Sequence, residues 1–374
     1  MIKYCQGCGA PLQEEDPNKR GFIPKIDPAA DKLYCKRCFR LNNYNELPKI
    51  LATNKEYEAV VDDLLTKNGL IVLIVDLFDF TGTFIPKILD KLRNKNVILV
   101  ANKLDLLPKS VKIEHIVDWL SYMVNRMFFR ADAIHVVSSK KGYYLDDLMN
   151  TIDYLRKGRD VYFMGCANVG KSSLINALLK RFTKSEKDLI STSPVPGTTL
   201  NSIKIPFFID NKAFIDTPGL INENNILSKI LPASYDKIMP NTEIKPQTFQ
   251  IKPGNTIFFG ALAQITLLEG EGVSFTCYFS SNVAIHRRKA EGSLEFLNKH
   301  GGEILTPPTR DEFLSLEYEE KTFEASTNKK EDIVISGLGF VAINKKAKVL
   351  VKIIKKTDVF KRAAIIWWWG FKYL

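Results

Sequence analysis

The order of three short motifs constrains this chain more than any other feature. Asn102-Lys103-Leu104-Asp105 comes first, Gly165-x4-Gly170-Lys171-Ser172 follows, and Asp216-Thr217-Pro218-Gly219 comes last. Chains that carry these motifs usually begin with the glycine-rich one. The order here indicates a circular permutation, cut between the strand of the last motif and the strand of the first. Because the ends of compact domains often lie close together, the same sheet tolerates such a cut.

Apolar runs alternate with helical patterns from about residue 56, which predicts βαβ units and a mainly parallel sheet of the α/β class. A motif stands at the end of each expected strand, where open α/β sheets bind their ligands. The expected strands are Leu70–Val75, Val97–Ala101, Ile134–Val137, Val161–Met164 and Ala213–Ile215.

The strand Val161–Met164, the glycine-rich loop after it and the apolar helix that follows form the context of a phosphate-binding P-loop. Its glycines let backbone amides close round a β-phosphate at a helix N-terminus. Lys171 is expected to bridge the β- and γ-phosphates, and the Ser172 hydroxyl to bind Mg²⁺. The nucleotide contacts expected from this loop are Gly165, Asn168, Val169, Gly170, Lys171, Ser172 and Ser173.

Two further loops are suited to reading a guanine base. In Asn102-Lys103-Leu104-Asp105, the Asp105 carboxylate can accept hydrogen bonds from N1–H and the exocyclic amine of guanine, which adenine cannot supply. Ser138-Ser139-Lys140 follows the next expected strand, and its Ser139 amide is expected to face the guanine O6. These loops and the P-loop fit one pocket, which favours GTP and GDP over ATP.

The remaining catalytic candidates surround the γ-phosphate. Asp216 is expected to hold Mg²⁺ through water, the Gly219 amide to meet the γ-phosphate, and Thr199, in Pro196-Gly197-Thr198-Thr199, to supply a second Mg²⁺ hydroxyl. Leu220 stands where many GTPases place the glutamine that orients water, which predicts slow hydrolysis.

Asn168 offers a side-chain oxygen to a K⁺ ion, which would bridge the phosphates and supply the positive charge of an arginine finger. The catalytic set is then Lys171, Thr199, Asp216, Gly219 and Asn168. The alternative reading is that Asn168 only shapes the loop, as asparagine does in many turns.

Four of the six cysteines form two Cys-x-x-Cys pairs, an arrangement that supplies four thiolates to a tetrahedral Zn²⁺. No histidine or carboxylate accompanies them, so a structural zinc finger is expected. The zinc ligands would be Cys5, Cys8, Cys35 and Cys38. Cys166 and Cys277 stand apart and are expected to be packing residues.

These motifs together resemble the YqeH-type circularly permuted GTPases, bacterial factors in assembly of the small ribosomal subunit. The resemblance covers nearly the whole chain and implies a zinc finger over residues 1–48, a permuted GTPase domain over 49–220 and a β-rich RNA- or ribosome-binding domain over 221–374. It also implies Mg²⁺ and K⁺-stimulated hydrolysis. The segment Asp76–Thr83 is similar to an acidic signature of the family, whose simplest role would be to cap the following helix.

The charge of the chain favours a polyanionic partner. The net charge is +11, and nine Lys or Arg accompany the single acid Asp358 between Lys345 and Lys372. His286-Arg287-Arg288-Lys289 adds a second basic run, so both are candidates for contacts with rRNA phosphates or ribosomal proteins. A solvated basic face with no partner is the plainer reading. The three tryptophans Trp367–Trp369 have no assigned role.

No targeting segment is evident, and no apolar run approaches the 20 or so residues that span a bilayer, so a cytoplasmic protein without a membrane partner is expected. Two rival functions stay open: an RNA-binding scaffold in which GDP is structural and turnover incidental, and an ATP-using kinase. The sequence leaves the oligomeric state undetermined.

Overall fold

The computed structural model describes residues 3–5, 11–16, 21–26, 33–36, 51–52, 54–182, 195–196, 202–231, 234–326 and 330–366. Its contacts divide the chain into two compact units. Unit 1 comprises Met1–Leu77, Ile85–Leu104 and Val124–Ile221, and unit 2 comprises Phe78–Phe84, Asp105–Met123 and Asn222–Leu374. Two short segments that the sequence assigned to the nucleotide-binding domain, 78–84 and 105–123, are therefore counted with unit 2.

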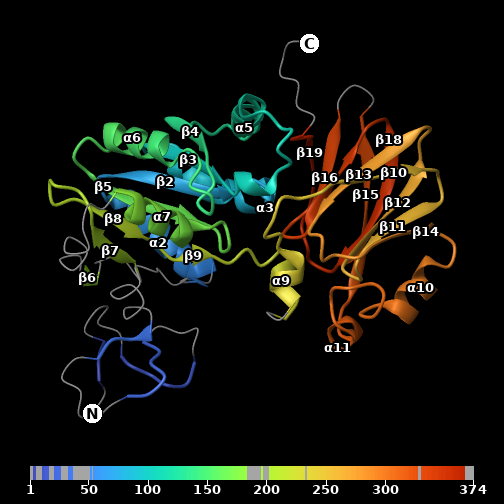
Figure 1. Ribbon diagram of the computed structural model, residues 1–374, viewed down its shortest axis with the longest axis horizontal. Coiled ribbons are helices and arrows are strands. Elements are labelled where there is room, and N and C mark those ends of the chain that lie inside the picture. The colour runs from blue at the N-terminus through green and yellow to red at the C-terminus, as the bar shows by residue number, and fades with distance from the viewer. Residues whose placement is uncertain are drawn as a thin grey trace. The chain divides into compact units, whose positions relative to one another are not determined.

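A seven-stranded sheet in the order β4-β3-β2-β5-β8-β7-β6 organises unit 1 (Figure 1). The strands from β4 to β8 run parallel, and β7 and β6 are added antiparallel. Strands β2 and β3 are buried along their whole length, as expected of parallel strands covered on both faces. The strands are β2 (Gly69–Asp76), β3 (Val97–Asn102), β4 (Ala133–Val136), β5 (Asp160–Gly165), β6 (Val195–Pro196), β7 (Ile203–Pro206) and β8 (Ala213–Asp216).

All five strands expected from the sequence are present, each with bounds within one residue of the prediction. Helix α7 packs on β5 and β8, and α6 packs on β2 and β5. The apolar residues of α6 that are buried, Leu145, Leu148 and Ile152, recur at helical spacing along one face. The helices with residues in unit 1 are α2 (Asn54–Thr66), α4 (Pro86–Leu92), α5 (Ile113–Arg126, shared with unit 2), α6 (Leu145–Arg156) and α7 (Lys171–Phe182), and the turn η1 covers Leu104–Leu106.

Unit 2 is built on two five-stranded antiparallel sheets, in the orders β10-β13-β17-β16-β19 and β14-β11-β12-β18-β15. Four β-rich runs of the sequence all lie within these sheets: Thr256–Phe259, Val273–Phe279, Asp332–Ile335 and Lys348–Ile354. The strands are β10 (Gln247–Ile251), β11 (Asn255–Phe259), β12 (Ala263–Glu269), β13 (Val273–Phe279), β14 (Ile285–Lys289), β15 (Tyr318–Ala325), β16 (Glu331–Ile335), β17 (Gly339–Ile343), β18 (Ala347–Ile354) and β19 (Val359–Ala363).

The two sheets of unit 2 share one apolar core, to which every second residue of most strands contributes. Phe259 of one sheet stacks on Phe279 of the other, with ring centroids 4.0 Å apart. Cys277 is buried in this core, which raises the pKa of its thiol and confirms the packing role expected of it. The short helices are α3 (Phe80–Thr83), α9 (Tyr235–Ile238), α10 (Ser293–His300) and α11 (Arg310–Leu314), with the turn η2 (Ile226–Ser228).

The segment Asp76–Thr83 was expected to cap the helix that follows it, and the side chain at the N-cap of that helix does not do so. Asp79 precedes α3, but its side chain makes no capping hydrogen bond. Its Oδ2 accepts instead from the Gly337 amide at 2.8 Å and from Asn225 Nδ2 at 3.1 Å. Three segments of unit 2 that are far apart in sequence therefore meet at one carboxylate.

A buried ion pair lies on the sheet of unit 2 that contains β19. Arg362 Nε donates to Asp332 Oδ2 at 3.3 Å, and both side chains are fully enclosed. The guanidinium lies 5.0 Å from the ring centroids of both Trp119 and Phe340, within the range of a cation–π contact. Trp119 Nε1 also donates to the Ala363 carbonyl at 2.9 Å, so this part of α5 is fixed to β19.

Among the described residues, no helix combines the length and the hydropathy needed to cross a bilayer.

Candidate nucleotide site

Asn102, the first residue of the expected base-reading motif, joins three loops of unit 1. It ends β3 and is fully buried. Its Nδ2 donates to the Val169 carbonyl in the P-loop at 3.0 Å and to Ser139 Oγ at 3.1 Å, while its Oδ1 accepts from the Ser139 amide at 3.0 Å. The three loops predicted to share one pocket are thus held together by one side chain.

The Ser139 amide is used differently from what the sequence suggested. It was expected to face the guanine O6, but it donates to Asn102. Ser138 is buried, and its Oγ accepts from the Lys141 amide at 3.0 Å, which closes the Ser138-Ser139-Lys140 turn on itself. The loop therefore supports the position of Asn102.

Glycine is required at two places in the P-loop. Gly170 has φ +87°, and a Cβ there would lie 2.4 Å from Asn102 Nδ2. A Cβ on Gly165 would lie 2.5 Å from the Ile74 carbonyl oxygen of β2. Asn168 also has a positive φ of 65°, a conformation that asparagine adopts more readily than most residues.

Lys171 and Asp216 form a buried ion pair where the ends of β5 and β8 meet the start of α7. Their side chains are 6% and 0% exposed, respectively. Asp216 Oδ2 is buried and has no hydrogen-bond partner among the described residues. A buried carboxylate oxygen without a partner, on an aspartate paired with the residue that precedes Ser172, fits the oxygen ligands that Mg²⁺ prefers. When bound, Mg²⁺ would neutralise phosphate charge.

Thr199, proposed for the second Mg²⁺ hydroxyl, lies outside the described residues, as does Gly197 before it.

The other two expected residues of the base-reading motif are Lys103 and Asp105. Lys103 has φ 72°, and its Nζ lies 2.5 Å from Asp76 Oδ2 at the end of β2. Asp105 belongs to the turn η1 and is half-buried.

The Asp216-Thr217-Pro218-Gly219 loop is fixed to the strand that carries the P-loop. Thr217 Oγ1 donates to the Phe163 carbonyl of β5 at 2.8 Å. Beyond it, the Leu220 carbonyl accepts from the Ala167 amide of the P-loop at 2.7 Å. The Leu220 side chain is buried, so it is held in the protein at the position where other GTPases place a water-orienting side chain.

A short strand, β1 (Leu51–Ala52), was not anticipated from the sequence. It pairs in parallel with β9 (Gly219–Leu220), in the register Leu51 to Gly219 and Ala52 to Leu220. The segment Gly219–Leu220, whose Gly219 amide was expected to meet the γ-phosphate, therefore lies between the P-loop and the segment that follows the cysteine-rich region. Two residues are too few for a periodic strand pattern, which explains why no signal revealed it.

The role of Tyr57 in α2 was also not anticipated from the sequence. It is fully buried, which raises the pKa of its hydroxyl, and that hydroxyl is hydrogen-bonded to the backbone of Gly165. The Tyr57 hydroxyl therefore helps to fix Gly165, the first residue of the P-loop. A tyrosine in an amphipathic helix gives no sequence signal that separates this role from ordinary packing.

The described part of the cysteine-rich region fits the thiol set of a zinc knuckle. Cys5 and Cys35 come from different Cys-x-x-Cys pairs, both are buried, and the Cys35 amide donates to Cys5 Sγ at 3.2 Å. Cys8 and Cys38 lie outside the described residues. Within the described residues, no group of three or more metal-binding side chains is found.

The geometry of unit 1, with a P-loop, a base-reading loop and an aspartate at the ends of neighbouring strands, defines a P-loop GTPase. Residues 160–245 match the family model of the 50S ribosome-binding GTPases. GTP, GDP and Mg²⁺ are accordingly the cofactors of the class. GTPase Der of Aquifex aeolicus is 30% identical over 186 residues, which are 46% of this chain and 39% of that protein.

Residues 272–365 match the YqeH-like C-terminal family model. The YqeH protein of Bacillus subtilis is 36% identical over 364 residues, covering 97% of this chain and 99% of the relative. The chain therefore belongs to the YqeH family of GTPases. The NO-associated protein 1 of Arabidopsis thaliana is 30% identical over 397 residues, with 91% of this chain and 70% of that protein covered.

Proposed function

We propose that this chain is a circularly permuted GTPase that acts as a switch in assembly of the small ribosomal subunit, binding rRNA or ribosomal proteins in the cytoplasm. The observation that carries the switch is the position of Asn102, which ties the base loop to the P-loop carbonyl of Val169. Occupation of the base pocket is thereby linked to the shape of the phosphate pocket. The match of residues 160–245 to the model of the 50S ribosome-binding GTPases supports a ribosomal partner, and the resemblance to the YqeH-type assembly factors is the reason for proposing the small subunit.

The permutation is supported by the strand order. The base loop follows β3 and the P-loop follows β5, yet the two strands are separated only by β2 in the sheet. Cutting an ordinary GTPase after the Asp-Thr-Pro-Gly loop produces this order and leaves Gly219 directly before the segment that leads into unit 2.

Turnover is proposed to be slow and stimulated by K⁺. The buried Leu220 supplies no polar group to orient water, so another charge has to stabilise the transition state. Asn168, whose backbone is in the left-handed region of the P-loop, is the proposed K⁺ contact. Cys5, Cys8, Cys35 and Cys38 are proposed to hold a structural Zn²⁺, supported by the contact between Cys35 and Cys5.

The test is sedimentation of the protein with purified 30S or 50S subunits, in the presence of a non-hydrolysable GTP analogue or of GDP. We expect association with 30S subunits that depends on the analogue and is lost in Lys171→Ala. Turnover is measured in KCl and in NaCl, with and without each subunit, and we expect stimulation by KCl and by 30S subunits.

The contrary outcomes are distinct. Association with 50S subunits alone would move the partner to the large subunit. Equal RNA affinity in both nucleotide states, with turnover indifferent to either subunit, would favour the scaffold with structural GDP. Equal turnover in the two salts would refute the K⁺ proposal without affecting the rest.

A further inference from the structure

The second sheet of unit 2 has two exposed edges that differ in charge. Its outer strands are β14 and β15 (Figure 1). On and beside β15, lysines lie next to carboxylates, as in the pairs of Lys321 with Glu319 at 2.9 Å and Lys352 with Glu320 at 3.0 Å. Lys355 with Glu317 at 2.9 Å continues the series. The β15 edge is therefore close to neutral.

The β14 edge carries an uncompensated positive charge. Arg287, Arg288 and Lys289 are consecutive and exposed, and Lys252 lies in the turn beside them, where Asn255 is paired with Lys289. Within the described parts of the chain, none of these four cations forms an ion pair. We define the basic edge as Lys252, His286, Arg287, Arg288 and Lys289.

An aromatic group lies directly beside these cations. The Arg288 guanidinium is 4.1 Å from the ring centroid of Phe296 on α10, and the ring of His300 is 4.5 Å from the same centroid. Stacking on an aromatic face orients a guanidinium, so less conformational freedom is lost when it binds a phosphate or a base. Because side chains alternate along a strand, Arg287 and Lys289 lie on one face of β14, and Arg288 lies with the aromatic rings on the other.

Edge strands often carry lysine and arginine simply to prevent pairing with other sheets. The β15 edge shows that paired charges are sufficient for protection in this same sheet. A net positive β14 edge therefore exceeds what edge protection requires. Cations on both faces of this edge, with Arg288 stacked on a ring, match the electrostatic and stacking demands of a single strand of nucleic acid, whose unpaired bases are available to aromatic side chains.

We propose that the basic edge binds a single-stranded segment of RNA, with the cations contacting successive phosphates and the group formed by Arg288, Phe296 and His300 stacking against an unpaired base. This inference rests on the proposed function, because it supplies the RNA contact of a ribosomal factor. It assigns that contact to the β14 edge and not to the basic run at the end of the chain.

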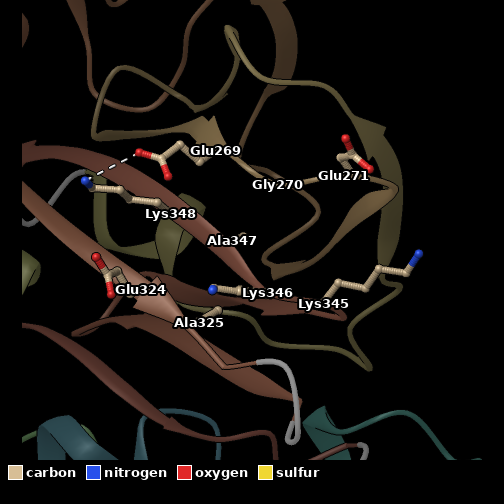
Figure 2. A pocket seen from close by; sticks show the side chains of 9 residues that line it. All are labelled: Glu269, Gly270, Glu271, Glu324, Ala325, Lys345, Lys346, Ala347 and Lys348. Atoms are coloured by element: carbon tan, nitrogen blue, oxygen red, sulfur yellow. Dashed lines mark ion pairs between the residues drawn. The ribbon is translucent and has the colours of Figure 1, made fainter.

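A second basic surface provides the matched comparison. A cavity of about 610 Å³ at the end of the same unit is lined by Lys345, Lys346 and Lys348 together with Glu269, Glu271 and Glu324. Figure 2 shows the lysines interspersed with the glutamates, and Lys348 paired with Glu269 at 3.5 Å. Positive and negative groups balance there, so this surface is expected to attract RNA weakly.

The experiment measures binding of the full-length protein to a fluorescent 20-nucleotide oligouridine and to a duplex RNA of equal length, by anisotropy over a range of salt concentrations. The test variant is Arg287→Glu/Arg288→Glu/Lys289→Glu. The control variant, with the same change in charge at the cavity of Figure 2, is Lys345→Glu/Lys346→Glu/Lys348→Glu. Phe296→Leu, which keeps an apolar contact for Phe258, removes only the ring.

We expect the test variant to bind oligouridine at least tenfold more weakly and to lower the log–log salt slope by about 2, as loss of three phosphate contacts to a single strand predicts. Phe296→Leu should weaken binding about fivefold without changing the slope, because base stacking is removed. The control variant should stay within about threefold of the unmutated protein. Urea unfolding curves that match the curve of the unmutated protein report that all three variants are folded.

Equal losses in the test and control variants, or no loss in the test variant, would overturn the assignment to the basic edge and leave the proposed function standing. If the test variant loses more affinity for the duplex than for oligouridine, the proposal that the bound RNA is single-stranded would be overturned. An unmutated protein without affinity for either RNA would contradict both this inference and the RNA partner in the proposed function.

Discussion

Replacing Asn102 with alanine tests whether the base loop and the P-loop are mechanically linked. The change removes three hydrogen bonds, two to Ser139 and one to the Val169 carbonyl. At about 1 kcal/mol net for each bond, the loss is about 3 kcal/mol. If it disorders the two loops in the free protein, nucleotide binding has to restore their order, and the apparent affinity for GDP falls by about 100-fold.

The assay is titration of each variant with a fluorescent GDP derivative at 25 °C, with urea unfolding as the check on stability. Asn125→Ala is the control, because Asn125 is an exposed position of α5. Less than a threefold change in affinity for Asn102→Ala, with the fold intact, would refute the link between the two loops.

A double-mutant cycle sharpens the same test. Gly170→Ala would place a Cβ 2.4 Å from Asn102 Nδ2 at a φ of +87°, so it should disrupt the same bond and add about 1–2 kcal/mol of backbone strain. In the Asn102→Ala background the clash is absent, and only the strain remains. Gly170→Ala should therefore cost less affinity in that background than alone, and additive effects would contradict the contact.

Three further changes are expected to have measurable effects. Asp105→Asn should shift preference from guanine to xanthine nucleotides in competition binding; an unchanged preference would reopen an ATP-using enzyme. Tyr57→Phe removes the hydroxyl bonded to the Gly165 backbone and should lower the free energy of unfolding by about 1 kcal/mol together with GDP affinity, whereas a loss of stability alone would restrict Tyr57 to packing. Burial raises the pKa of Asp332 from 3.8 to about 6 in spite of its pairing with Arg362, so the folded state binds this proton more tightly than the unfolded chain. Its contribution to stability is therefore complete below pH 3.8 and is lost as the pH rises through 6. Asp332→Asn removes this titrating group and should flatten the urea stability curve between about pH 4.5 and 7.5; a slope equal to that of the unmutated protein would contradict this assignment.

The sheet of unit 1 was predictable because its signals are local. Each strand from β2 to β8 that ends at a motif is an apolar run of several residues, and parallel strands covered on both faces leave such runs in the sequence. The P-loop required Gly170 and Lys171 at fixed spacing, so its position could be predicted as well. The pairing of β1 with β9 and the support of Gly165 by Tyr57 depend on contacts between distant segments and left no such pattern.

Charge counted along the chain could not distinguish the two basic runs. Between Lys345 and Lys372 nine cations accompany one acid, and His286-Arg287-Arg288-Lys289 is the shorter run. In the folded protein five of the nine are neutralised by acids from elsewhere. The pairs are Lys348 with Glu269, Lys352 with Glu320, Lys355 with Glu317, Lys361 with Glu331, and Arg362 with Asp332.

By itself, the sequence determined the chemistry of this protein. A phosphate loop, a base-reading loop and a metal-binding aspartate are short peptides whose function depends on residue type and spacing, and the strands that carry them are local apolar runs. Only the tertiary structure decided how these parts are joined and where free charge is exposed. Asn102 became the link between two loops, Leu220 was buried against the P-loop, and the β14 edge kept its cations unpaired. The reason is physical: hydrogen bonds and ion pairs depend on distances in space, and those distances are set by the packing of strands and helices that are remote in sequence.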